Sequence, residues 1–194
     1  MAIGGVDWDD FYEAVAGRPP RDETTRAIAA GPPGFAVELG CGDGIDTTAL
    51  LAAGWEVLAI DAEPSAIRRV RDLTAGHGTV ATEVARFEDL DDLPPADLVL
   101  ASYTLPFCPP DAFGRLWATI AAALEGGGRF SGNFFGPHDS WFGSPGLTFH
   151  TKDDVAQLFE GFAMEFFEEL DEGGSTADGS DKHWHVMSVM ATRA

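Results

Sequence analysis

Basic residues are scarce in this chain, and lysines are the scarcest. Of its 194 residues, 12 are Lys or Arg and 32 are Asp or Glu, so the formal net charge is −20, and Lys152 and Lys182 are the only lysines. Binding to nucleic acids or anionic membranes needs basic side chains that neutralise phosphates. We therefore expect neither as a partner. The acidic surface fits a saline cytoplasm, where salt screens self-repulsion, and equally a genome that favours Arg codons.

Cysteines and long apolar segments are also few. Cys41 and Cys108 form no CxxC pair and no disulfide framework, so reduced thiols are expected. No apolar stretch approaches the roughly 20 residues that a membrane span requires. The sequence starts MAIGGVDWDD, without the basic start and hydrophobic middle of a secretory signal. These absences predict a cytoplasmic protein, and the length makes one domain, residues 1–194, the default.

What the sequence does contain is a regular alternation of strand and helix patterns. Short apolar runs suited to buried strands lie at residues 35–39, 56–60, 80–85, 96–102 and 129–135. Helical patterns separate them, over residues 46–53, from 64 onward and over 109–124. Parallel βαβ units have this rhythm. With right-handed crossovers it predicts an α/β doubly wound, Rossmann-like sandwich with helices on both faces of a mostly parallel sheet.

The first 34 residues have a different pattern. Aromatic and apolar side chains spaced three and four apart predict an amphipathic helix, formed by Trp8, Phe11, Tyr12 and Val15. Pro19 and Pro20 should end this helix, and a second short helix is expected over 24–30. Residues 1–34 are therefore expected to be a helical lid or substrate region.

Residues 136–194 are expected to form a substrate-side segment and to close the sheet. Thr151-Lys-Asp-Asp is close to a capping box, and the helix that it opens should run to about Glu160. Residues 162–170 and 183–192 then have strand patterns, joined by the loop DEGGSTADGSD. No helix fits between them, so they should form an antiparallel hairpin at one edge of a seven-stranded sheet.

Residues 37–44 read VELGCGDG, at the point where the first strand ends and a helix begins. Ligands of open parallel sheets bind beyond the carboxyl ends of the strands. Glycines there let the backbone turn tightly and approach a ligand, and the helix start adds free N–H donors. Asp61 ends the second strand, 21 residues after Gly40, where an acid accepts hydrogen bonds from ribose hydroxyls. The pattern predicts a nucleotide cofactor.

Two cofactor classes compete for this turn. A dinucleotide site requires G-x-G-x-x-G, whereas the register here is G-x-G-x-G and Ile45 follows Gly44. The carboxylate of Glu38 would also lie badly beside a pyrophosphate. It suits a ligand with an ammonium and a sulfonium, namely S-adenosylmethionine. A nicotinamide-dinucleotide-dependent oxidoreductase and a non-catalytic nucleotide-binding module are the alternatives.

The run AVELGCGDGIDTTALLAAGWEVLAIDAEPSAI resembles the signature of the class I S-adenosylmethionine-dependent methyltransferases. The resemblance covers roughly residues 35–135 by motif, the expected cofactor-binding core, and this family typically adds a seventh, antiparallel strand. It implies that the acid, the glycines and the residues between them wrap the methionine portion of the cofactor: Glu38, Gly40, Cys41, Gly42, Asp43 and Gly44. It also implies that the ribose binds Asp61 and that the adenine lies against Ala62, Phe87 and Glu88.

The segment ASYTLPF follows the fourth strand, where this family borders the transferred methyl group, so Ser102 joins the candidate cofactor-binding residues. It lacks the Asn/Asp-Pro-Pro-Tyr/Phe sequence of amino-group methyltransferases that act on bases or glutamine side chains. Four more segments resemble small bacterial methyltransferases described as tellurite-resistance or thiopurine-methyltransferase-like: DWDDFY, LPFCPPDAF, FFGPHDSW and KHWHV. The resemblance implies a small-molecule acceptor, with a thiol or a chalcogen oxyanion as one class that fits, and a monomer or homodimer.

Some candidate side chains have both a functional and a structural interpretation. Trp8 and Tyr12 either form a lid over the cofactor, with aromatic faces near the sulfonium, or pack as an ordinary amphipathic helix. Arg18 and Arg21 flank the Pro-Pro turn, where they either neutralise an anion or are solvated. Cys108 is assigned to packing, since nothing nearby except a helix start would lower its pKa.

Histidines gather in the last third of the chain. His138 and Asp139 follow the fifth strand, where substrate-side residues often lie, and are the candidate catalytic residues. His183 and His185 are two residues apart and so share one face of a strand. They are interpreted as structural or as substrate contacts, and no metal site is expected.

Overall fold

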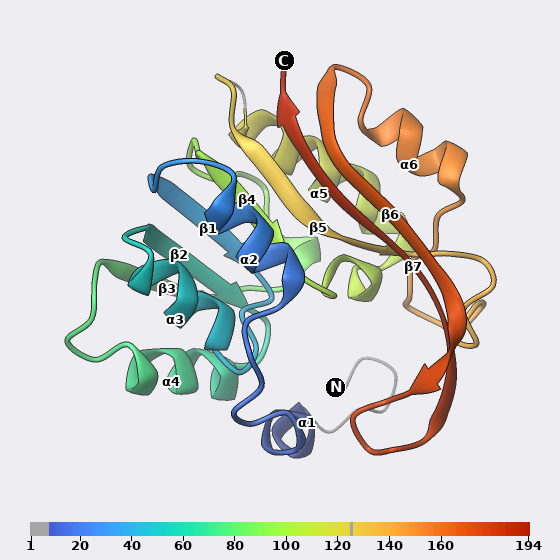
Figure 1. The fold of residues 1–194 in the computed structure, drawn as a ribbon, viewed down its shortest axis with the longest axis horizontal. Helices are drawn as coiled ribbons and strands as arrows, with labels where there is room; N and C mark the ends of the chain where they lie inside the picture. Colours follow the sequence, from blue (N-terminus) through green and yellow to red (C-terminus); the bar gives the residue numbers. More distant parts are fainter. Residues whose placement is uncertain (1–7, 125) are drawn as a thin grey trace.

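The computed structural model describes residues 8–124 and 126–194, so residues 1–7 of the expected 1–34 helical region lie outside the described residues. One seven-stranded sheet forms in the order β3-β2-β1-β4-β5-β7-β6, and helices cover both of its faces (Figure 1). The strands are β1 (Phe35–Leu39), β2 (Glu56–Asp61), β3 (Val80–Val84), β4 (Leu98–Ala101), β5 (Arg129–Phe135), β6 (Phe162–Ser175) and β7 (Asp181–Arg193). The helices are α1 (Trp8–Ala14), α2 (Asp22–Ala29), α3 (Ile45–Ala52), α4 (Pro64–Leu73), α5 (Pro110–Ala123) and α6 (Lys152–Leu158).

The topology confirms the predicted fold class. Strands β1 to β5 pair in parallel, whereas β7 pairs antiparallel with both β5 and β6. The chain runs from β1 to β2 and β3 on one side, and then crosses to β4 and β5 on the other. The strand order therefore reverses between β1 and β4, and a crevice opens there at the carboxyl ends of the strands.

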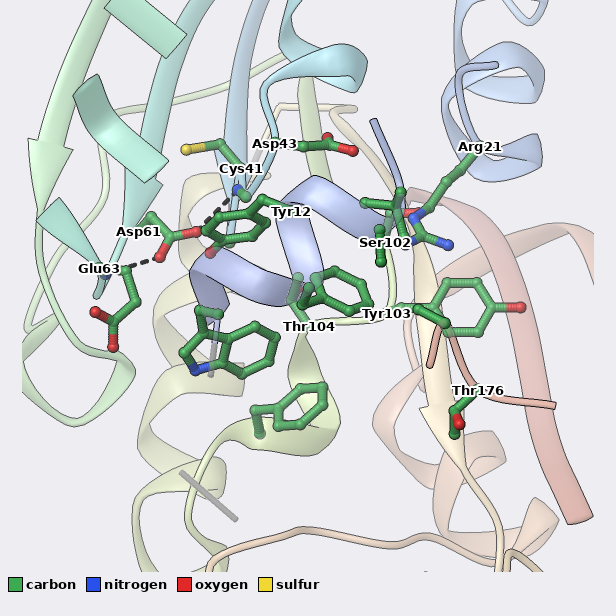
Figure 2. Close-up of a pocket in the computed structure, with 18 of the residues that line it drawn as sticks. Tyr12, Arg21, Cys41, Asp43, Asp61, Glu63, Ser102, Tyr103, Thr104 and Thr176 are labelled. Carbon is green, nitrogen blue, oxygen red and sulfur yellow. Dashed lines mark hydrogen bonds between the residues drawn. The ribbon is translucent and has the colours of Figure 1, made fainter. Parts of the chain in front are cut away.

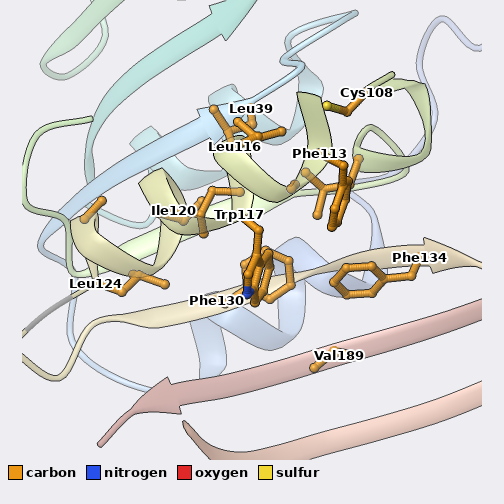
Figure 3. Close-up of a cluster of buried hydrophobic side chains, with 14 of the residues drawn as sticks. Leu39, Cys108, Phe113, Leu116, Trp117, Ile120, Leu124, Phe130, Phe134 and Val189 are labelled. Carbon is orange, nitrogen blue, oxygen red and sulfur yellow. The ribbon is translucent and has the colours of Figure 1, made fainter. Parts of the chain in front are cut away.

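Two hydrophobic cores hold the helices to the sheet, one on each face. Successive strand residues point to opposite faces, so in β1 Ala36 packs toward α2, α3 and α4 while Val37 and Leu39 pack toward α5. On the α5 face the rings of Trp117 and Phe130 lie 5.3 Å apart, edge to face (Figure 3). This double burial fixes where the strands end, and hence where the turns after them lie.

The closing hairpin is longer than the sequence pattern indicates. The residues expected to be a loop from Asp171 onward continue the ladder, from the pair Asp171–His185 to the pair Ser175–Asp181. The prediction that DEGGSTADGSD forms a loop is therefore wrong, since only residues 176–180 make the turn. The backbone hydrogen bonds of the ladder outweigh the weak strand propensity of the glycines, a case of tertiary context overriding propensity.

This extension leaves the sheet. Pairing of β7 with β5 stops at Val186, opposite Phe135, so the last five pairs of the hairpin form a two-stranded ribbon without a third strand. In Figure 1 the ribbon curves away from the sheet toward α1. It thereby brings the hairpin turn, residues 176–180, to the same side as the turn after β1.

Three smaller features complete the fold. The capping box is present, because the Thr151 hydroxyl accepts the Asp154 N–H and the Asp154 carboxylate accepts the Thr151 N–H, although α6 ends at Leu158 rather than Glu160. Short 3-10 helices at Phe87–Asp89 and Leu105–Phe107 were not predicted. Among the described residues, no helix has the length and apolar character that crossing a membrane would require.

Candidate active site

A cavity of about 1280 Å³ opens at the carboxyl ends of β1, β2 and β4. Helix α1 and the tip of the hairpin also line it, so its walls come from both ends of the chain. Figure 2 shows Asp61 and Glu63 at one end of this cavity and Arg21 and Tyr103 at the other. We call these the cofactor end and the acceptor end, after the functions argued below.

The turn after β1 is built for close backbone contact. Gly40 has φ of 74°, in the left-handed region that glycine tolerates best. A Cβ at this position would come within 2.4 Å of the Thr104 side chain, whose hydroxyl donates to the carbonyl of Leu39 at 2.8 Å. Gly44 starts α3 and does not line the cavity, unlike the other residues of the predicted turn. The glycines let the turn pack against the β4 loop.

Asp61 supports the same turn from β2. Its carboxylate accepts the N–H of Gly42 at 2.9 Å and the N–H of Glu63 at 2.8 Å. The side chain lines the cavity, and burial raises its pKa. The Asp61 carboxylate, which the sequence analysis assigns to ribose binding, thus also has a structural role, because it holds the glycine turn.

Glu38 is a buried acid without a basic partner. It is 3% exposed, and the Thr47 hydroxyl donates to its carboxylate. No ion pair to it is found among residues 8–124 and 126–194. Burial, and then the nearby Asp46, raise its pKa well above the ordinary value. A cationic ligand in the cavity would relieve both effects.

Arg18 is the nearest candidate partner for Glu38, but two other acids hold it. Its guanidinium donates to Asp43 at 2.8 and 2.9 Å and to Asp46. Asp46 also accepts the Arg21 N–H at 2.8 Å and the Thr24 hydroxyl at 2.7 Å. These bonds tie the segment between α1 and α2 to the glycine turn. Arg18 therefore has a structural role and is not part of a solvated turn.

Helix α1 covers the turn. Tyr12 is buried, and its ring edge would lie 3.3 Å from a Cβ on Gly42. Trp8 stacks on Tyr12 at 6.3 Å and meets Phe107 edge to face at 5.3 Å. Burial, and then Asp61, raise the pKa of the Tyr12 hydroxyl far above its ordinary value. Both predicted lid residues line the cavity, so α1 closes its cofactor end.

The remaining predicted cofactor residues also line the cavity. Ala62, Phe87 and Glu88 lie at the cofactor end, where Glu88 pairs with Arg86 at 2.8 Å. Cys41 is buried there, and its pKa is raised well above the ordinary value by burial and by Glu38. Ser102 lies farther along and donates to the buried carboxylate of Glu23 at 3.1 Å. The structure brings together every predicted cofactor residue except Gly44.

The acceptor end is an aromatic wall. Sequence reasoning placed the segment ASYTLPF and Trp141 on the substrate side but did not predict the wall that they form with Phe135 and Trp184. Its side chains come from the loop after β4, from β5, from the following turn and from β7: Tyr103, Phe107, Phe135, Trp141 and Trp184. Behind the wall, Lys182 is buried, with Nζ 3.7 Å from the Trp141 ring centre and 4.3 Å from that of Trp184. Burial lowers its pKa, and the buried Asp139 pairs with it. The ion pair anchors both tryptophans.

The predicted catalytic residues lie outside the cavity. Asp139 accepts from Lys182 and from the Trp141 N–H at 2.9 Å, and so organises the turn behind the wall. The His138 side chain is 66% exposed and pairs with Asp171 of the ribbon at 2.8 Å. Their catalytic role stays a prediction that this geometry does not support, because neither side chain faces the cavity.

His183 and His185 lie beside His138 rather than in the cavity. His183 pairs with Asp171 at 2.7 Å and His185 with Glu169 at 3.0 Å. Ligand atoms of His138, Asp171 and His185 come within 4.8 Å of one another. The rings of His138 and His185 stack, however, with their centres 4.7 Å apart, and Nδ1 of His185 already accepts the backbone N–H of His138. The lone pairs of these two rings therefore do not converge on one point. We interpret the group as structural.

Cys108 matches its predicted packing role. The side chain is fully buried, and burial raises the pKa of its thiol to about 12. The thiolate that a nucleophile requires is therefore not available at neutral pH.

Comparison with known proteins finds domains similar to part of this chain. Residues 36–128 match the family model of a methyltransferase domain. TehB from Haemophilus influenzae has a similar structure, with 12% identity and a TM-score of 0.80 over 96% of this chain, which spans 66% of that chain. A comparison with curated proteins finds no match.

Two further solved structures align with this chain over nearly its whole length and over nearly all of their own length. The N-methyltransferase NodS from Bradyrhizobium japonicum WM9, in complex with S-adenosyl-L-homocysteine, has 15% identity and a TM-score of 0.73 over 96% of this chain and 97% of its own. The magnesium protoporphyrin IX methyltransferase ChlM from Synechocystis PCC 6803, with bound SAM, has 13% identity and a TM-score of 0.71. This match covers 99% of this chain and 93% of that chain. At these identities the likeness shows the fold. With the domain match, it confirms the resemblance to class I methyltransferases.

Proposed function

We propose that this protein is an S-adenosylmethionine-dependent methyltransferase that acts on a small molecule, with a thiol or a chalcogen oxyanion as the acceptor class. One observation carries the proposal. A buried carboxylate without a basic partner, Glu38, lies beside the glycine turn in the same cavity as Asp61. A methyltransferase domain on residues 36–128 supports it.

The residues at the cofactor end fit this cofactor. Glu38 lines the cavity beside Gly40 and Gly42, where it would accept hydrogen bonds from the ammonium of the methionine portion. Asp61 takes the ribose, and Phe87 provides a flat surface for the adenine. A pyrophosphate would meet Glu38 as a second negative charge, which disfavours a dinucleotide.

When bound, S-adenosylmethionine supplies an electrophilic methyl group on a sulfonium. The chain contributes position and exclusion of water, which are large terms when a displacement needs in-line approach. Trp8 and Tyr12 cover the cofactor end, and the aromatic wall shields the acceptor end. No histidine among the described residues lines the cavity. An acceptor that is already anionic, such as a thiolate or an oxyanion, needs no general base.

The cofactor assignment is tested by thermal shift. S-adenosylhomocysteine should raise the melting temperature of the protein, whereas NAD and NADP should not, because only the former carries an ammonium for Glu38. Stabilisation by a nicotinamide dinucleotide alone would replace our proposal with an oxidoreductase.

The reaction is tested by release of S-adenosylhomocysteine over a panel of thiols, selenite, tellurite and small carboxylates. Glu38→Gln serves as the cofactor-deficient variant, and Glu56→Gln, an exposed acid on β2, as its matched control. Turnover that survives in the control and is lost in Glu38→Gln supports the proposal. Tight cofactor binding with no turnover on any acceptor would instead favour a non-catalytic binding module.

A further inference from the structure

Arg21 differs from the other arginines that line the cavity. Arg18 is held by Asp43 and Asp46, and Arg86 by Glu88. Within the described residues, the Arg21 guanidinium has no hydrogen bond and no ion pair. The guanidinium lies over the ring of Tyr103, with its Cζ 4.8 Å from the ring centre. Asp46 and Asp43 favour its charge through space but do not pair with it, so among the described residues its N–H donors remain available to a ligand in the cavity.

The backbone fixes Arg21 at this place. It follows Pro19 and Pro20 and directly precedes α2, and its N–H donates to Asp46 at 2.8 Å. Burial, and then the neighbouring Arg18, lower the pKa of Arg21. Both effects disfavour the charged form, so the free protein maintains a half-buried cation at an electrostatic cost that an anion would offset.

Tyr103 is fixed in an unusual conformation beside it. With φ of 57°, it is the sole non-glycine residue of the described chain with a positive φ. Its N–H donates to Asn133 at 3.0 Å, and Asn133 is itself held by Glu23 and Ser188 at 2.8 Å each. The ring meets Trp184 edge to face at 6.4 Å. Strain of this kind is maintained at functional sites where it positions a side chain.

We propose that Arg21 and Tyr103 form an anion-binding subsite, which takes a carboxylate or an oxyanion at the acceptor end of the cavity. A guanidinium offers a planar pair of N–H donors that matches a carboxylate, and the Tyr103 ring keeps that plane oriented. Figure 2 shows both side chains on the side of the cavity away from Asp61. The subsite rests on the proposed function, in which a cofactor and an acceptor share this cavity.

Two molecules can supply the anion, and they require separate measurements. The cofactor carries a methionine carboxylate, while an acceptor carries its own charged group. S-adenosylhomocysteine and 5′-methylthioadenosine differ by the amino-acid portion, which tests the first source. 4-Mercaptobenzoate and 4-mercaptobenzamide have nearly the same shape but differ in charge, which tests the second, measured by calorimetry on protein saturated with S-adenosylhomocysteine.

The variants are Arg21→Gln and Arg21→Lys, with Arg26→Gln as the matched control. Arg26 lies one helical turn away in α2, over the ring of Phe166, and does not line the cavity. We expect Arg21→Gln to weaken binding of one carboxylate ligand by about tenfold and to leave its uncharged counterpart within roughly twofold. Arg21→Lys should restore part of this affinity, because it keeps the charge without the planar donors.

Each outcome has a distinct meaning. A loss for S-adenosylhomocysteine but not for 5′-methylthioadenosine assigns the subsite to the cofactor, and a loss for 4-mercaptobenzoate but not for the amide assigns it to the acceptor. If Arg21→Gln changes neither carboxylate ligand beyond the Arg26→Gln control, the subsite does not exist. Failure of the wild-type protein to bind S-adenosylhomocysteine would contradict the proposed function instead, and 4-mercaptobenzoate alone would then decide the subsite.

Discussion

The two ends of the cavity are built in different ways. The cofactor end is built around one βαβ unit, in which Glu38, the glycine turn and Asp61 follow one another along β1, α3 and β2. The acceptor end is assembled from distant segments, since Tyr103, Trp141 and Trp184 meet only because the hairpin extends beyond the sheet. The first has a local code that related folds share, whereas the second depends on contacts that each chain sets for itself.

The two ends also differ in charge. Buried acids at the cofactor end have raised pKa values and lack basic partners. At the acceptor end Arg21 makes no ion pair with any described residue and lies over the Tyr103 ring, whereas Lys182, behind the aromatic rings, is paired with Asp139. Under the proposed function, Glu38 would face the positive charge of the cofactor and Arg21 would face an anionic group.

The largest effect is expected behind the aromatic wall, from Lys182→Met. The variant leaves Asp139 buried without its cation, and breaking such a pair from one side costs about 3–5 kcal/mol. Adding Asp139→Asn should recover about 2 kcal/mol, because the remaining group is neutral and still accepts the Trp141 N–H. Urea unfolding of the single and double variants measures the loss of stability and its recovery. Equal stability of the two would show that the ion pair does not hold the wall.

A smaller loss is expected from Gly40→Ala at the cofactor end. The new Cβ would meet Thr104 and a left-handed backbone at once, for a total of about 3 kcal/mol. Gly76→Ala is the matched control, because Gly76 also has a positive φ, 81°, but no atom within 4 Å. Its cost should be about 1 kcal/mol, the conformational part alone. Unfolding free energies that do not differ between the two would remove the contact with Thr104 from the explanation.

The cofactor end could be predicted from the sequence because its signals are local. Glycine spacing sets the turn, and the next strand must end at the same sheet edge, so Glu38 and Asp61 share a cavity without further information. Every predicted cofactor residue except Gly44 lines the cavity. Gly44 instead lies against α4, which explains its φ of 79° by packing rather than by a ligand.

The acceptor end could not be predicted in this way. Nothing local marks Tyr103, since tyrosine rarely has a positive φ and Asn133, which holds it, lies 30 residues away. His138 follows the fifth strand as expected, but its direction is set by Asp171 on a ribbon that the glycines had suggested was a loop. The positions of Tyr103 and His138 both depend on which distant segments of the chain pair, and a single sequence does not reveal that pairing.

Removing the acid of the cofactor end should reduce affinity rather than stability. Glu38→Gln is expected to weaken S-adenosylhomocysteine binding by about 2 kcal/mol, or roughly thirtyfold, since it loses a charged hydrogen-bond partner for the ammonium. Calorimetry with Glu56→Gln as the control measures it. Unchanged affinity would move the ammonium away from Glu38.

The same variant has a pH signature. Because the folded pKa of Glu38 is raised, the carboxyl contributes stability below its ordinary value of 4.5 and loses it as the pH rises through the folded value. Wild-type free protein should therefore lose stability relative to Glu38→Gln as the pH rises through this window, while its affinity for S-adenosylhomocysteine rises. Parallel pH profiles for the two proteins would contradict a raised pKa of Glu38 in the free protein.

The smallest effect is expected at the residue that the sequence favoured for catalysis. His138→Ala removes a side chain that is 66% exposed and outside the cavity, so acceptor turnover should stay within roughly twofold. Trp184→Leu is the informative partner, because Trp184 lines the wall and lies in β7 beside His183 and His185. It should lower kcat/KM for the acceptor about tenfold, the loss of one aromatic contact, with cofactor affinity unchanged. If His138→Ala proves the more damaging of the two, the turn after β5 must bring His138 into the cavity during turnover, and the acceptor end is then formed by movement rather than by the wall alone.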